Sequence, residues 1–126
     1  GIKNENNRFP PYSKPIRPYK CWNNMTIMPY NFEADVHYLY GKSFDISLFE
    51  EFKSSEFLIM DFHPIHIYLN TDTNETYQNA REFFQTNKLS VYKNTKFFGV
   101  RDLLIRTFEE IKSSNLKTYN LKDFLV

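Results

Sequence analysis

The sequence predicts an α/β protein with parallel strands. Short apolar runs typical of buried strands alternate with amphipathic helical segments. The 126 residues suit one domain, and 41% hydrophobic with 25% charged residues is ordinary for a globular chain. The expected strands are too few for a finished sheet, and a complete (β/α)₈ barrel needs roughly 200–250 residues. We therefore expect residues 1–126 to form a single domain that is part of a larger body.

The composition excludes several classes of function. Lys and Arg number 16 against 15 Asp and Glu, so the chain lacks the strong positive field typical of proteins that bind nucleic acid. No apolar run approaches 18 residues, and no membrane-spanning segment is expected. The single cysteine, Cys21, excludes an internal disulfide and favours a reducing, cytoplasmic location. Because the sequence begins with Gly1 and has no signal-peptide pattern, we expect its true N-terminus to lie upstream.

Residues 1–32 are expected to form an extended, proline-rich segment laid over a larger body. Each proline removes a backbone donor and favours extended geometry in the residue before it. The segment also carries much apolar surface, which a flexible linker would lack. A short strand is expected at residues 26–28. The prolines of this segment are Pro10, Pro11, Pro15, Pro18 and Pro29.

The middle of the chain alternates helix and strand signals. A helix is expected over residues 34–40, and Asp45 is expected to cap a second helix over residues 46–54. The apolar run at residues 57–62 is typical of a strand buried on both faces. This run predicts that Leu58 and Met60 are almost fully buried.

The last third of the chain is predicted to be mainly helical. Asp72 and Glu75 resemble a capping box that opens a helix ending near Phe84. A short strand is expected at residues 91–92. The strongest helix signal covers residues 100–113, where apolar residues recur at helical spacing. These residues are Val100, Leu103, Leu104, Phe108 and Ile111.

The candidate chemistry lies in two clusters, residues 31–38 and 61–70, which hold all three histidines. In parallel α/β proteins, residues just past the carboxyl end of a strand face the active site. His63 directly follows the predicted strand, with Asp61 two residues earlier. A role in general acid–base catalysis is therefore expected for His63.

The other polar residues have structural alternatives. His66 is interpreted first as a partly buried histidine bonded to the backbone, and His37 suits a helix surface equally well. Glu33 and Asp35 suit helix capping as well as chemistry. A zinc site built from two histidines and one of these carboxylates is a further alternative. However, the HPIH run is not expected on a helix, because Pro64 blocks that geometry for His63.

Two stretches carry a resemblance to a known family. They are residues 57–70, FLIMDFHPIHIYLN, and residues 28–37, MPYNFEADVH. Together they resemble the C-terminal half of polysaccharide deacetylases, and more narrowly the NodB-like branch found among surface-polysaccharide biosynthesis proteins. Residues 99–104, GVRDLL, and 119–124, YNLKDF, are similar to the closing helix and tail of that superfamily. The resemblance covers residues 25–126.

The resemblance implies a partial (β/α) barrel of the polysaccharide-deacetylase type, preceded by the extended proline-rich segment. It implies a divalent metal, with zinc expected, held by an Asp and two His of early strands that lie outside this chain. No metal is therefore expected in this chain alone. A histidine of a late strand protonates the departing amine in the family. His63 matches that histidine, and Asp35 matches the acidic residue that orients it.

We therefore expect part of a metal-dependent carbohydrate N-deacetylase that acts on an acetylated saccharide, with His63 and Asp35 as catalytic residues. Without the other half of the barrel, the chain is expected to be inactive. The alternative is a non-catalytic module that binds carbohydrate through exposed aromatic rings or acts through protein contacts. Substrate contacts are expected from His66, His37, Glu33 and Trp22.

Overall fold

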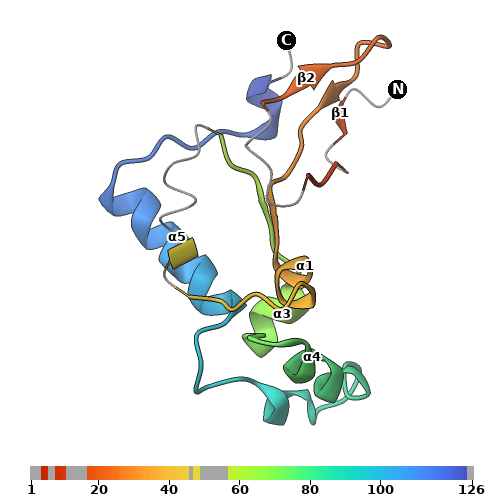
Figure 1. The fold of residues 1–126 in the computed structure, drawn as a ribbon, viewed down its shortest axis with the longest axis vertical. Helices are drawn as coiled ribbons and strands as arrows, with labels where there is room; N and C mark the ends of the chain where they lie inside the picture. The colour runs from red at the N-terminus through yellow and green to blue at the C-terminus, as the bar shows by residue number, and fades with distance from the viewer. Residues whose placement is uncertain (1–3, 6–7, 11–16, 46, 49–56, 125–126) are drawn as a thin grey trace.

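The computed structural model describes residues 4–5, 8–10, 17–45, 47–48 and 57–124, which form a mixed α/β structure (Figure 1). Its strands are short and belong to two sheets. They are β1 (Asn4–Glu5), β2 (Tyr19–Lys20), β3 (Thr26–Ile27), β4 (Phe32–Glu33) and β5 (Met60–Asp61). The α-helices are α1 (Ala34–Leu39), α3 (Pro64–Leu69), α4 (Asn74–Arg81) and α5 (Val100–Ser113), and the 3₁₀ helices are η1 (Leu89–Tyr92) and η2 (Leu121–Phe124).

The first sheet is built from the proline-rich segment. Strand β3 lies at its centre, parallel to β1 and antiparallel to β2. The hairpin between β2 and β3 turns through Asn24, whose φ of 61° is left-handed. The strand expected at residues 26–28 is confirmed as β3, and the described part of residues 1–24 contains no helix.

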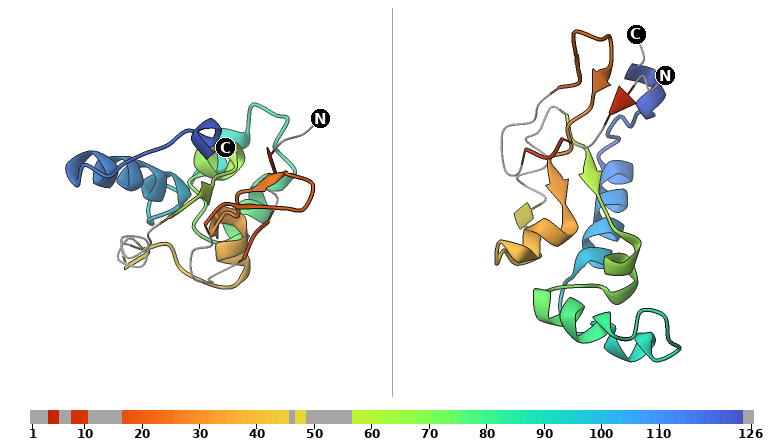
Figure 2. Two further views of the ribbon diagram at one scale, coloured as in Figure 1. Left: turned by 90° about the horizontal axis from the view of Figure 1, so that it is seen from above. Right: turned by 90° about the vertical axis from the view of Figure 1, so that its right-hand side faces the viewer.

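The second sheet consists of the parallel pair β4 and β5, which lie side by side (Figure 2). Phe32 pairs with Met60 and Glu33 with Asp61, and the Asn31 N–H donates to the Ile59 carbonyl at 2.9 Å. The predicted strand at 57–62 is wrong in extent, because only Met60 and Asp61 are paired. Within the described residues β5 has a neighbour on one edge, and neither sheet closes into a barrel.

The expectation that β5 is buried on both faces is also wrong. Leu58 and Met60 are half-buried, and Met60 packs against the core from one side of the strand. A two-stranded sheet has too few neighbours to cover both of its faces. One face of β5 therefore stays available for polar side chains.

Helices α1 and α3 each follow a strand directly. Helix α1 confirms the expectation for residues 34–40 and begins after Glu33, whose backbone is still extended. Helix α3 corrects the expectation that HPIH is not helical, because Pro64 is its first residue. A proline is tolerated there, since the first N–H groups of a helix have no intrahelical acceptor. Only His63 stays outside, as the N-cap.

Three other expectations need correction or lie outside the description. Helix α4 is capped by Thr73, whose hydroxyl accepts from the Thr76 N–H at 3.3 Å, and not by Asp72. It ends at Arg81, short of the expected Phe84. The strand expected at 91–92 is instead part of η1. The expected helix 46–54 falls largely outside the described residues.

Helix α5 confirms the expected bounds of 100–113, but its apolar stripe is covered only at the N-terminal end. Val100 and Leu103 are buried, whereas Phe108 is 63% exposed. The buried end packs into a core shared with β4 and α1. The members of that core are Phe32, Ala34, Tyr38, Phe44, Leu48, Val100 and Leu103.

A network of polar groups joins the end of α3 to the start of α5. Asn70 ends α3 in the left-handed conformation with φ of 53°, and its side-chain amide donates to Asp102 Oδ2 at 2.8 Å. Its side-chain oxygen accepts from the Arg101 N–H at 3.0 Å. The Arg101 guanidinium donates to the carbonyls of Ile67 and Tyr68 near the end of α3. This junction fixes the helix that directly follows His63.

Candidate functional site

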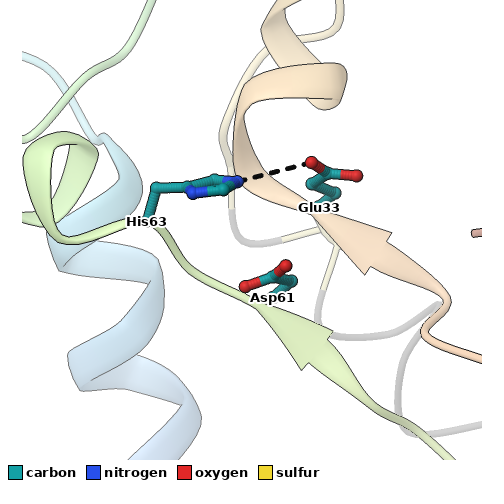
Figure 3. Close-up of side chains that lie close together, drawn as sticks. All are labelled: Glu33, Asp61 and His63. Carbon is teal, nitrogen blue, oxygen red and sulfur yellow. Dashed lines mark hydrogen bonds and ion pairs between the residues drawn. The ribbon is translucent and has the colours of Figure 1, made fainter. Parts of the chain in front are cut away.

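The carboxyl ends of β4 and β5 present three polar side chains on one face. Along β5, Met60 and Phe62 pack against the core, while Asp61 and His63 alternate with them. Successive side chains of a strand point to opposite faces, so Asp61 and His63 share the other face. Glu33 pairs with Asp61 across the sheet and joins them there (Figure 3).

His63 lies between two carboxylates. Its Nε2 atom is 3.4 Å from Glu33 Oε1 and 3.9 Å from Asp35 Oδ2. The side chain of His63 is 43% exposed, whereas Glu33 is 16% and Asp35 29% exposed. Asp35 lies in the first turn of α1, where its Oδ1 accepts from the Val36 N–H at 2.8 Å. The expected approach of Asp35 to His63 is present, and Glu33 comes nearer still.

The surroundings of Glu33 favour its protonated form. Burial raises the pKa of the Glu33 carboxyl, and the nearby charge of Asp35 adds to this, while the contact with His63 opposes it. Tyr30 hydrogen-bonds to Glu33, and burial together with the charge of Glu33 raises the pKa of the Tyr30 hydroxyl. The site therefore holds a histidine, two carboxyl groups and a neutral phenol that can exchange and stabilise protons.

His66 and His37 were expected to contact substrate, but the structure places both in the interior. His66 is 3% exposed, and its two ring nitrogens lie 3.1 Å from Thr71 Oγ1 and 3.3 Å from the Tyr38 hydroxyl. His37 is 1% exposed, with Nε2 2.9 Å from the Ser43 carbonyl oxygen. Both contacts are typical of structural histidines, although the partners of His66 are side chains and not the expected backbone.

Burial of His66 predicts a pH-dependent stability. Desolvation lowers the pKa of His66 from 6.5 to about 4 in the folded protein. Below pH 6.5 the unfolded chain therefore binds a proton that the folded chain refuses. We expect the free energy of unfolding to fall by roughly 2 kcal/mol between pH 7 and pH 4, allowing for solvent screening. Urea denaturation across this range should show a weaker decline in His66→Gln, and an equal decline in both proteins would contradict the assignment.

Trp22 does not lie at the site. It is 97% exposed and lies in the hairpin between β2 and β3. Figure 1 shows this hairpin at one end of the molecule, away from α1 and α3. Its expected contact with substrate stays a prediction.

The sequence analysis missed Asp61 as a site residue. Asp61, Glu33 and His63 each offer one ligand atom, and these atoms lie within 4.8 Å of one another. The signal was present in the alternation of apolar and polar residues from Met60 to His63, which places positions 61 and 63 on one face. One imidazole nitrogen and two carboxylate oxygens are donors that a divalent ion such as Zn²⁺ accepts, so the donor types fit a metal. Nε2 of His63, however, cannot hold a metal and a transferable proton together.

The model of a known protein family matches residues 1–81, which is more than half of the chain, and is described as WbmS-like polysaccharide deacetylase. The chain belongs to this family. The match includes residues 1–24, which precede the resemblance at residues 25–126, and it ends at Arg81, the last residue of α4. We therefore interpret the cluster of Glu33, Asp35, Asp61 and His63 as part of a WbmS-like polysaccharide deacetylase.

A solved structure extends the comparison beyond residue 81. It is a protein of Bordetella bronchiseptica, assigned as a polysaccharide deacetylase involved in O-antigen biosynthesis, with 29% sequence identity and a TM-score of 0.75. The match covers 86% of this WbmS-like chain and 46% of the other, so the chain spans about half the length of that relative. No curated protein matches the sequence significantly. None of the described helices has the length and apolar character needed to cross a lipid bilayer.

Proposed function

We propose that this chain supplies the general acid of a carbohydrate N-deacetylase, and that His63 is that acid. The observation that carries the proposal is the position of His63 at the open carboxyl end of β5, with Nε2 3.4 Å from Glu33 and 3.9 Å from Asp35. An imidazole at this position can donate a proton from Nε2, and the two neighbouring carboxyl groups can orient its ring.

The chemistry of amide hydrolysis requires such a donor. Water adds to the acetamide carbonyl, and the C–N bond then breaks to give acetate and a free amino sugar. An amide nitrogen leaves poorly as an anion, so a proton must reach it as the bond breaks. In the proposal this proton moves from Nε2 of His63 to the nitrogen. Asp35 and Glu33 orient the ring and stabilise its charge, which makes them positioning residues.

The proposal locates the family's metal outside these residues. When bound, a divalent ion, for which we propose zinc, polarises the carbonyl and the attacking water. The resemblance assigns it to an Asp and two His of early strands, and His63 must keep Nε2 free for its proton. We therefore place the metal in the remaining part of the barrel and propose that these 126 residues alone do not turn over substrate.

The exposed side of α5 supports a larger barrel. Ile105 and Phe108 are 50% and 63% exposed, and the extended chain after the helix also leaves Leu116 and Tyr119 exposed. Apolar area of this kind is usually covered by another surface. We propose that the remaining part of the deacetylase barrel packs there, since the chain spans 46% of its relative.

Asp35→Asn tests the proposal through the kinetics of deacetylation by the complete protein. Asparagine keeps the size of the side chain but removes the carboxylate whose Oδ2 lies 3.9 Å from Nε2 of His63. Because a positioning residue acts on the chemical step and not on substrate binding, we expect kcat to fall by about threefold to tenfold with little change in KM. The measurement is amine release from an acetylated oligosaccharide over a range of substrate concentrations, with thermal unfolding of the same samples to verify folding.

The matched control is Glu82→Gln, which removes an exposed carboxylate at the C-terminal end of α4. Its kcat and KM should equal those of the unaltered protein. An unchanged kcat in Asp35→Asn would mean that Asp35 is structural and that His63 does not depend on it.

A further inference from the structure

Two hollows lie beside Phe97, and neither is lined by a residue of the His63 cluster. One has a volume of about 450 Å³ and is bordered by α4 and the segment from Tyr92 to Phe97. The other, of about 430 Å³, is bordered by Tyr38, the turn at Gly41 and the start of α4. Asp72, Thr73 and Phe97 line both hollows, which are together called the depression below.

Phe97 is an exposed ring on a fixed backbone. The ring is 66% exposed. Its backbone N–H donates to Asn94 Oδ1 at 3.0 Å, and its carbonyl accepts from Asn94 Nδ2 at 2.8 Å. Asn94 Nδ2 also donates to the Asn70 carbonyl at 3.0 Å, which ties this segment to the end of α3. A backbone held in place before any ligand arrives reduces the conformational entropy that is lost on binding.

The rest of the lining can recognise hydroxyl and acetamido groups. Glu75 and Asn79 of α4 line the first hollow together with Lys96. Asn74 and Lys42 lie in the second hollow, beside its aromatic wall of Tyr38, Phe44 and Phe98. Acceptors, donors and apolar rings are all present. This mixture suits an uncharged, hydroxyl-rich ligand with apolar faces, since such ligands need orienting hydrogen bonds and an aromatic platform.

The depression lies close to the candidate site without being part of it. Tyr38 lines the second hollow, and its hydroxyl is 3.3 Å from Nε2 of His66. The rings of His66 and His63 are 6.0 Å apart. Helix α4 and the segment after it also follow the carboxyl end of β5, the end at which His63 lies (Figure 1).

We propose that this depression is a second saccharide site, which holds N-acetylhexosamine units of a polysaccharide with one sugar face against the ring of Phe97. The inference rests on the proposed function for its ligand class, because a deacetylase that acts on a long chain has units beyond the one at His63. A sugar unit bound in this site is not hydrolysed, so its binding can be measured independently of turnover.

The test measures binding of triacetylchitotriose by calorimetry and by amide NMR shifts. We expect Phe97→Ala to weaken binding about threefold to tenfold, with the shifts centred on α4 and residues 93–97. The control Tyr19→Ala removes an exposed ring, 46%, from β2 and should bind as the unaltered protein does. A second variant, Asn79→Ala, tests the polar side of the first hollow and should also weaken binding.

Three results would overturn the proposal. They are no binding of the probe, equal binding by Phe97→Ala and the unaltered protein, and equal weakening in Tyr19→Ala. His63→Gln separates this site from the catalytic proposal, because it should bind the probe with unchanged affinity and shifts. If turnover also survives in His63→Gln, the general-acid proposal fails while the binding result stands by itself.

Discussion

Replacing His63 by glutamine should lower the kcat of deacetylation in the complete protein by about 10²–10⁴-fold, with little change in KM. Glutamine keeps a polar side chain beside Glu33 and Asp35, but it carries no proton that it can release. The expected loss therefore reports proton transfer to the departing nitrogen and not a disturbed fold. Amine release from an acetylated oligosaccharide gives kcat and KM, and thermal unfolding of the same samples verifies folding.

A substrate that needs no proton on its leaving group makes this test specific. An aryl acetate releases a stable phenolate, so His63→Gln should hydrolyse it at nearly the rate of the unaltered protein. Equal losses on the amide and the aryl ester would assign His63 to another role, such as holding the metal with Glu33 and Asp61. Unchanged amide turnover would favour the non-catalytic, carbohydrate-binding alternative.

Gly99→Ala should reduce the free energy of unfolding by about 2–3 kcal/mol. The φ of Gly99 is −134°, which any residue adopts, so backbone freedom is not the reason for glycine here. A Cβ atom at this position would lie 2.3 Å from the Asn70 carbonyl oxygen and 2.7 Å from Asn70 Oδ1. These atoms cannot yield easily, because Asn94 and Arg101 donate hydrogen bonds to them.

Gly41→Ala is the matched control, because its strain comes from the backbone conformation and not from a steric contact. Gly41 has a φ of 67°, yet nothing lies within 4 Å of a Cβ placed there. The substitution should lower the free energy of unfolding by about 1 kcal/mol, because alanine is strained in the left-handed conformation. Urea denaturation of both variants compares the two effects. A larger loss in Gly41→Ala than in Gly99→Ala would contradict the role given to the contact between Gly99 and Asn70.

The elements that sequence reasoning located correctly are those specified by local signals. Helix α5 was predicted to the residue, because apolar spacing and Asp102 in its first turn agree. The position of His63 followed from an apolar run that ends in polar residues. Helix α3 was missed, since a proline at the first helical residue was taken as a helix breaker. The strand expected at residues 91–92 rested on β-propensity alone, which tertiary contacts override readily.

The parts that could not be predicted depend on contacts between distant residues. Glu33 and Asp35 were equal candidates until the pairing of β4 with β5 placed Glu33 opposite Asp61. The exposure of Phe108 could not be read from its helical spacing, because periodicity shows which face is apolar and not what covers it. Phe97 had no sequence signal, since its fixed backbone depends on Asn94 and Asn70.

The parallel register of β4 and β5 has a genetic consequence. Side chains alternate along a strand, so losing one codon between Ile59 and His63 would carry core side chains to the site face and site side chains to the core. The backbone pairing itself could persist, because any residue other than proline can donate to it. In-frame deletions here should therefore give proteins whose secondary structure is nearly intact but whose site is lost. Point substitutions at the same positions would disturb one side chain at a time, so we expect this stretch to tolerate replacement far better than a change of length.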